Sequence, residues 1–485
     1  MTDELTLSYL GALTDAQLKH YKSIVIARNY HDGRQNVELT TRLQEFLGEG
    51  FGSVEFRLNL VRSVVTSMSE KLSVDGFDSE DKAKIEWAKA TWEANNMDSV
   101  QDDVYEAALS ESAHYIIVDW PDKNRKYARW IPQQQFTPME AGGDDSGCFL
   151  KYPEDDPHQE PEYGVKYWVE YMEDERGNKV LTQRKTLYYP DKIAKYRRGK
   201  RGDWEAYQDE GDEEWPIPWV DSLGDPLGIA LIPFYNGQLR PEALDGIPVQ
   251  DAVNKIMLDL LSTEDMTAYR VFVALGFIPT TDGLELKSDL SNALTIKPGI
   301  VIGTTKSKTE ADMKAIEPAD LKPITDSLQQ LIVWMALVTD TPVTRFITTK
   351  LVSSDETLKQ QEQPLIAKVE NRQKLFGLGF KRCFELSLKL SSEYAPEDTP
   401  DSEKPLSLVW RSAKSLKDRL EELTLKKGLG VPNEQIWTEL GYSQDKITEW
   451  ANAKEAAMPD ITPQTDPNQD GGTETQGVED GNTEE

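Results

Sequence analysis

The N-terminal half alternates between helical and strand-like patterns of apolar residues. Between Phe56 and Leu72, apolar side chains recur every three or four positions, as one buried face of a helix requires. Two further helices are predicted at 78–95 and 99–109, and the segment His114–Trp120, HYIIVDW, has the composition of a strand. From about 129 to 233 the chain is aromatic and strand-like. These patterns predict a mixed α+β unit.

One hairpin is predicted within this strand-rich region. The segments YGVKYWVEYM and VLTQRKTLYYP flank the turn-forming residues Arg176, Gly177 and Asn178. Two strand-like segments joined through such residues favour an antiparallel pair.

Two apolar helical segments, Gly246–Phe272 and Leu321–Thr339, lie at the centre of the chain and enclose a β-rich insert that glycines interrupt. The second contains an eight-residue apolar run, Leu331–Val338, which a single surface helix would leave partly exposed to water. The Thr341-Pro342 pair predicts its end, because a residue before proline disfavours the helical conformation.

The C-terminal region has only helical patterns before its composition changes. A long helix is predicted at 356–393, followed by helices at 415–427, 433–440 and 444–454. Beyond 458 the chain is rich in Pro, Gly, Thr, Gln and acidic residues, which predicts a disordered tail.

Net charge restricts the kind of partner that the chain can bind. The 485 residues carry a net charge of −31, and the last 27 residues hold eight acids and no Lys or Arg, so that −23 remains on the rest. Broad sequence-independent affinity for DNA needs many Lys and Arg that release counterions from phosphates. Any contact with DNA is therefore expected to be local.

The sequence predicts a soluble chain from a reducing compartment. Its two cysteines, Cys148 and Cys383, form no CxxC pair. The N-terminus lacks the pattern of a secretory signal, and the longest apolar run of eight residues is far shorter than the roughly 20 that cross a bilayer.

Motifs for catalysis, metals or cofactors are not found. The segment Gly299–Gly303 has three residues between its glycines and a displaced Lys306, whereas a phosphate-binding loop needs four residues and an adjacent lysine. The four histidines lie on separate predicted elements, and the acidic runs lack the spacing of a calcium loop. We therefore expect no enzyme, no cofactor and no metal site.

Two short segments are basic or neutral within this acidic chain. Lys297, Lys306 and Lys308 fall in a stretch, 290–309, that contains no acid. Arg345 and Lys350 lie among small hydroxylated residues between two predicted helices. Each segment is as consistent with an exposed loop as with a surface for an acidic partner or DNA.

Several segments, in order along most of the chain, resemble the portal family of tailed, siphovirus-type bacteriophages. They are Asn29–Gln35, Asn59–Val65, Val74–Phe77, Asp225–Gly228, Ile232–Asn236, Val249–Asn254, Thr341-Pro342 with Phe346, Glu356–Lys359, Gln363–Lys368, Trp410 with Ser412 and Asp418, Lys426–Gly428 and Leu440-Gly441. The sequence departs from the family's pattern at Ser353–Asp355 and at Ser110–Ser112, where glycines are common.

The resemblance implies an α+β phage portal fold that assembles as a ring, with an all-helical crown. Its expected parts are a mixed α/β wing (1–245), a first stem helix (246–271), a β-rich clip (272–318), a second stem helix (319–341), a tunnel loop region (342–358), a helical crown (359–458) and a disordered acidic tail (459–485).

The implied function is structural. Such a ring, most often a dodecamer, occupies one capsid vertex, and double-stranded DNA passes through it during packaging by a separate terminase motor and during ejection. The implied partners are the terminase large subunit, a head-tail adaptor and the major capsid and scaffold proteins, with no membrane; the particle would assemble in the host cytoplasm. A non-viral acidic scaffold or adaptor and a DNA-packaging ATPase are the alternatives.

The resemblance also suggests roles for individual residues. Tunnel-loop contacts with DNA are expected from Arg345, Thr348, Thr349, Lys350, Ser353 and Ser354, clip contacts with partner proteins from Lys297, Lys306 and Lys308, and ring packing from Leu331, Ile332, Trp334 and Met335.

Overall fold

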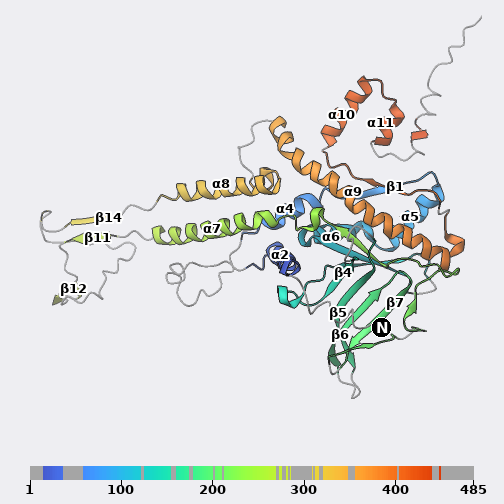
Figure 1. The fold of residues 1–485 in the computed structure, drawn as a ribbon. Coiled ribbons are helices and arrows are strands. Elements are labelled where there is room, and N and C mark those ends of the chain that lie inside the picture. Colours follow the sequence, from blue (N-terminus) through green and yellow to red (C-terminus); the bar gives the residue numbers. More distant parts are fainter. Residues whose placement is uncertain are drawn as a thin grey trace, which may run out of the picture. The chain divides into compact units, whose positions relative to one another are not determined.

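A computed structural model provides the fold (Figure 1). It describes residues 15–35, 58–121, 125–153, 160–173, 179–199, 202–209, 212, 214–268, 272–275, 280–281, 284–285, 309, 312–315, 320–347, 355–400, 403–414, 416–439, 447–448 and 450. Clustering of contacts divides the chain into two compact units, residues 1–413 and 414–485.

Four helices lie in the N-terminal region: α2 (Asp15–His31), α4 (Leu60–Ser69), α5 (Lys82–Ala94) and α6 (Met97–Glu111). The last three confirm the helices predicted at 56–72, 78–95 and 99–109. Asn59 precedes α4 and accepts a hydrogen bond from the Arg62 amide at 3.2 Å, and Asp81 caps α5 through the Ala83 amide at 2.9 Å. Each cap satisfies an amide that has no partner within the helix.

A three-stranded antiparallel sheet lies inside the main core. Its order is β10 (Leu231–Tyr235), β2 (Ala113–Asp119), β3 (Arg129–Gln134), and β2 is the strand predicted at HYIIVDW. The central strand is buried along nearly its whole length because α6 and α9 both pack against it. A strand covered on both faces has a continuous apolar run rather than strict alternation.

A second sheet contains the predicted hairpin. Its order is β4 (Gly147–Lys151), β5 (Tyr163–Glu173), β6 (Lys179–Tyr188), β7 (Lys192–Arg198) and β8 (Trp204–Ala206), and β9 (Ile217–Pro218) also pairs with β7. Strands β5 and β6 pair antiparallel, with Tyr171 opposite Leu181. A smaller apolar core, which includes Phe136 and Phe149, joins this sheet to α2.

The two central helices form an antiparallel pair, α7 (Ile247–Ala268) and α8 (Lys322–Thr339), which lie side by side (Figure 1). Between them, β11 (Phe272–Leu275) pairs with β14 (Asp312–Ala315), and β12 (Thr280–Thr281) pairs with β13 (Leu284–Glu285). A helix pair enclosing a β-rich insert is therefore confirmed, whereas residues 286–308 of the insert lie outside the described residues.

The long helix α9 (Asp355–Tyr394) confirms the helix predicted at 356–393. Its aromatic side chains Phe380 and Phe384 pack against Trp92 and Trp130 at ring-centroid distances of 4.9–6.4 Å. A side chain at Gly379 would lie 2.8 Å from the ring of Phe234, so the glycine lets α9 approach the sheet closely. This helix thus shares one core with the N-terminal elements.

One expectation for the C-terminal region is wrong. Residues Ser407–Trp410 form a strand, β15, which pairs antiparallel with β1 (Val74–Asp78), so the predicted crown is not all-helical. The four-residue strand is too short for its alternating pattern to stand out in the sequence. Beyond it, α10 (Leu416–Gly428) and α11 (Asn433–Glu439) belong to the second compact unit.

Short 3-10 turns occur at Met139–Ala141, Gly237–Leu239, Leu244–Gly246, Val343–Arg345 and Pro396–Asp398.

Candidate functional site: the root and the outer face of the α7–α8 pair

The two helices meet most closely where α7 begins and α8 ends. Gly246 precedes α7, and a Cβ built there would lie 2.7 Å from Met335 Sδ and 3.0 Å from Thr339 Cγ2. Met335 is fully buried. The absence of a side chain at 246 therefore sets the closest approach of the two helices.

The residues expected to pack the ring divide between two faces of α8. Leu331, Ile332 and Met335 are buried within the chain itself, whereas Trp334 is 50% exposed. The chain's own core thus covers three of the four residues, and only Trp334 is left exposed; the packing of these residues in a ring stays a prediction. An apolar run on every side of a helix does not show which side faces the core.

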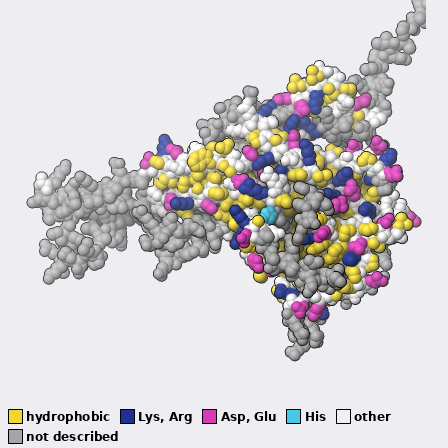
Figure 2. Space-filling view, in the orientation of Figure 1, with side chains coloured by type: hydrophobic (Ala, Val, Ile, Leu, Met, Phe, Trp, Pro, Cys, Tyr) yellow, Lys and Arg dark blue, Asp and Glu magenta, His cyan; other side chains and the backbone are white. Residues whose placement is uncertain are grey.

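The outer face of α8 is apolar and uncharged. Trp334, Leu337 and Val338 are 50%, 74% and 45% exposed, and no charged residue occurs between Asp326 and Asp340. Figure 2 shows hydrophobic side chains gathered over the α7–α8 pair. A contiguous exposed apolar face on an otherwise charged protein is typical of an interaction surface.

Two buried amide side chains attach α7 to the segment before α4. Gln250 accepts a hydrogen bond from the Leu60 amide at 2.8 Å and donates one to the Leu58 carbonyl. Asn254, one turn later, accepts from the Leu58 amide at 3.2 Å. Sequence analysis missed this role, although a Gln and an Asn four positions apart among apolar residues are an available signal.

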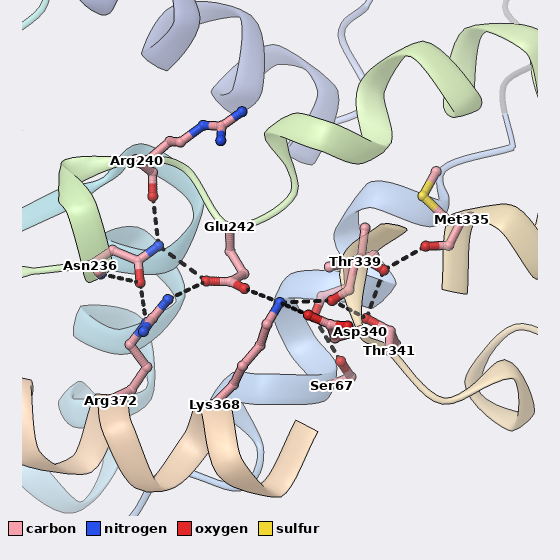
Figure 3. Close-up of polar contacts among 12 residues, drawn as sticks. Ser67, Asn236, Arg240, Glu242, Met335, Thr339, Asp340, Thr341, Lys368 and Arg372 are labelled. Carbon is pink, nitrogen blue, oxygen red and sulfur yellow. Dashed lines mark hydrogen bonds and ion pairs between the residues drawn. The ribbon is translucent and has the colours of Figure 1, made fainter. Parts of the chain in front are cut away.

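A second polar cluster connects α9 to the segment that leads into α7 (Figure 3). Glu242 is 5% exposed, and its two carboxylate oxygens accept hydrogen bonds from Lys368 Nζ and Arg372 Nη2, each at 2.9 Å. Arg372 also donates through Nε to Asn236 Oδ1. Burial alone would raise the pKa of Glu242, but the two cations outweigh burial and lower the pKa below its ordinary value.

Lys368 also contacts the end of α8. Its Nζ donates to the Thr339 carbonyl at 3.0 Å and pairs with Asp340 Oδ2 at 3.2 Å. Asp340 adopts a left-handed conformation with φ 51°, and the Thr341 amide returns to the Ala336 carbonyl at 2.9 Å. A cation at the carbonyl end of a helix stabilises its dipole. The predicted helix end before Pro342 is confirmed.

Of the predicted tunnel-loop residues, only Arg345 is described, and its guanidinium pairs with the Glu70 carboxylate. Thr348, Thr349, Lys350, Ser353 and Ser354 lie outside the described residues, as do the clip residues Lys297, Lys306 and Lys308. The structure thus does not test the expected contacts of these residues with DNA or partner proteins.

The part of the chain that the structure describes contains buried titratable groups but no candidate metal site. No group of three or more His, Cys, Asp or Glu residues there could hold a metal ion. Burial lowers the pKa of His114 to about 4 and raises the pKa of Cys148 to about 12, so both groups are neutral at physiological pH. Within the same residues, no helix combines the length and apolar character needed to cross a membrane.

Comparison with known proteins finds similarity to phage portal proteins. Residues 56–460 match the family model for phage portal proteins, SPP1 Gp6-like. The portal protein of Mycobacterium phage D29 is 23% identical over 426 residues, covering 82% of this chain and 79% of that protein. The portal protein of Mycobacterium phage L5 is 22% identical over 429 residues, with the same coverage.

The solved structures that resemble this chain have lower sequence identity to it. A chain from the virion of a native gene transfer agent particle has a TM-score of 0.37 at 10% identity, covering 87% of this chain and 99% of that one. A chain from the neck of an empty particle of the same kind has a TM-score of 0.39 at 9% identity, covering 79% and 89%. Because the family model spans most of the sequence, this chain belongs to the phage portal protein family, SPP1 Gp6-like.

Proposed function

We propose that this chain is the structural subunit of a portal ring at one capsid vertex, through which double-stranded DNA is packaged and later ejected. Family membership supports the portal role. The observation that carries ring formation is the outer face of α8, where Trp334, Leu337 and Val338 are left exposed by the described residues of the same chain. A neighbouring copy would remove this apolar surface from water.

The proposed subunit has the parts that its resemblance to the portal family implies. Residues 1–245 form the wing, α7 and α8 the stem, 272–318 the clip, 342–358 the tunnel loop region and 359–458 the crown. Because α9 packs into the same core as the wing, its aromatic side chains would fix this helix to the wing within each subunit.

The acidic character of the chain suits a passage through which DNA moves without binding. Phosphates are repelled by an acidic surface, so the duplex would slide without adhering. Local contacts would come from the tunnel loop, with Lys350 as the main candidate, because Arg345 already pairs with Glu70. The clip lysines Lys297, Lys306 and Lys308 would contact the terminase large subunit or a head-tail adaptor.

The chain itself would catalyse no reaction. Packaging energy would come from the terminase motor, and the remaining partners would be the major capsid and scaffold proteins. The subunits, about twelve in a ring, would assemble in the host cytoplasm and remain in the virion.

Electron microscopy of the purified full-length chain in negative stain tests this proposal. Closed rings with a central channel, together with no ATP hydrolysis by the same preparation, are the expected result. Monomers at all protein concentrations, or ATP hydrolysis that copurifies with the chain, would contradict it.

The Lys350→Glu substitution tests the proposed contact with DNA separately. It should reduce packaging or retention of DNA in phage particles while rings form normally, because it reverses the charge facing the phosphates. Unchanged packaging in particles with intact rings would rule out this contact.

A further inference from the structure

A single ammonium group joins three segments that are distant in the sequence. Lys368 Nζ lies 2.9 Å from Glu242 Oε1, 3.0 Å from the Thr339 carbonyl oxygen and 3.2 Å from Asp340 Oδ2 (Figure 3). The ammonium donates hydrogen bonds to Glu242 and to the Thr339 carbonyl, and its contact with Asp340 is an ion pair. The contacts link α9, the segment before α7 and the end of α8.

The Glu242 end of this cluster is held firmly by the wing. The Glu242 amide donates to the Leu109 carbonyl at 2.8 Å, and the Asn236 amide donates to the Ser112 carbonyl at 2.9 Å. Leu109 belongs to α6, and Ser112 follows its last residue. Asn236 Nδ2 also donates to Glu242 Oε2 at 3.3 Å, so Glu242 is fixed to the wing through both its backbone and its side chain.

The Asp340 end, in contrast, lies at the surface. The Asp340 carboxylate is 50% exposed and the Glu242 carboxylate only 5%. Directly after Asp340 the chain passes through Thr341-Pro342 into the 3-10 turn Val343–Arg345 and then into the proposed tunnel loop. Lys368 thus contacts both a fixed buried anion and the last turn before this loop.

We propose that Lys368 is a positioning residue that fixes where the tunnel loop leaves α8, and that it couples the position of this loop to the wing through Glu242. The proposal rests on the proposed portal function for its relevance to DNA, but its geometry belongs to the single chain. A shift of the loop that moved Thr339 and Asp340 would break two of the three ammonium contacts. Of the three contacts of Lys368, only the ion pair with Glu242 would then remain.

The first test measures hydrogen exchange in the full-length chain. The reporters are the amides of Thr341, Phe346 and Ile347, which are hydrogen-bonded at 2.9–3.1 Å directly after α8. Lys368→Met keeps an unbranched side chain of similar length but removes the charge and all three donors. Exchange at the reporter amides should become about ten- to a hundredfold faster, because charge-assisted hydrogen bonds to the helix end are lost.

Three further variants separate positioning from general stability. Lys368→Arg restores a cation with several donors and should recover most of the protection, and Asp340→Asn should give a smaller acceleration confined to the same amides. Lys374→Met removes a lysine from the same helix that lies outside this cluster and should change nothing. Amides of the β5–β6 pair, which contains none of the residues of this cluster, should keep the wild-type exchange rate in every variant.

Two outcomes would overturn the proposal. The first is unchanged exchange at Thr341, Phe346 and Ile347 in Lys368→Met. The second is an equal acceleration at these amides and in the β5–β6 pair, since that result would show a general loss of stability. Neither outcome depends on ring formation, so failure of the portal proposal would be seen separately, as the absence of rings.

A second experiment connects the contact to function. Phage particles carrying Lys368→Met should contain intact rings but several-fold fewer filled capsids than particles carrying Lys374→Met. Equal numbers of filled capsids would show that the position of the loop does not depend on Lys368.

Discussion

The closest contact between α7 and α8 predicts that Gly246→Ala separates the two helices. The new Cβ would lie 2.7 Å from Met335 Sδ and 3.0 Å from Thr339 Cγ2. Ordinary carbon contacts are about 3.5–4.0 Å. Met335 is 0% exposed and Thr339 only 3%, so moving either side chain away from the new methyl group disturbs the core around it. We therefore expect the two helices to move apart.

The size of this effect follows from two opposing terms. Overpacking a filled core costs about 1–3 kcal/mol. The alanine also restricts the unfolded chain, which stabilises the folded protein by about 0.4–1 kcal/mol. We therefore expect Gly246→Ala to reduce the free energy of unfolding by about 1–2 kcal/mol. Urea unfolding followed by tryptophan fluorescence measures this change.

A double-mutant cycle identifies the contact responsible. Met335→Ala alone should reduce the free energy of unfolding by about 2–5 kcal/mol, because it leaves a cavity. In the double variant the methyl group that Gly246→Ala introduces can enter that cavity, so the combined loss should be smaller than the sum by at least about 1 kcal/mol. Gly76→Ala is the control, because a Cβ there meets no atom within 4 Å.

The reasoning would be refuted by either of two results. If Gly246→Ala unfolded like Gly76→Ala, the close approach of the helices would not be real. If the two losses at 246 and 335 were simply additive, Met335 would not be the side chain that the new methyl group meets.

Three further predictions concern other parts of the chain. Ser112 has φ 96°, a conformation that favours glycine, so Ser112→Gly should leave the protein about 1 kcal/mol more stable than Ser112→Ala in urea unfolding, whereas equal losses would show no strain. Leu337→Glu should prevent ring assembly in electron micrographs but change the free energy of unfolding by less than about 0.5 kcal/mol, with Leu378→Glu, at a 59% exposed leucine on α9, as the control, and normal rings would contradict the proposed interface. Because the pKa of Glu242 is lowered, its charge stabilises the fold above about pH 4.5, and this stabilisation is lost as the pH falls through the lower pKa of the folded protein. The difference in unfolding free energy between wild type and Glu242→Gln should therefore shrink from about pH 7 to about pH 3. A difference that stays constant would show that the charge of Glu242 does not stabilise the fold.

Local patterns in the sequence were sufficient to predict most of the individual helices and strands. The long helix α9, the strand β2 and the β5–β6 hairpin were predicted because each has a clear periodicity or a turn signal over many residues. The strand β15 was missed because four residues are too few for periodicity. Its pairing with β1 joins residues more than 300 positions apart, which no local pattern reports.

The candidate site was less predictable than the fold. The apolar run in α8 indicated a packed helix, but only the contacts with Gly246 show that Met335 faces inward and Leu337 outward. The cluster around Glu242 combines four charged residues from three separate segments, each of them ordinary in its own sequence context. Such clusters depend on tertiary structure and are not visible in one sequence.

The most important proposal is that this chain forms a ring in which the outer face of α8 lies against a neighbouring copy. Cryo-electron microscopy of the assembled full-length chain tests it most directly. We predict a closed ring in which Trp334, Leu337 and Val338 of each subunit are buried by the adjacent one. A ring in which these three side chains face solvent, or a chain that stays monomeric, would contradict the account.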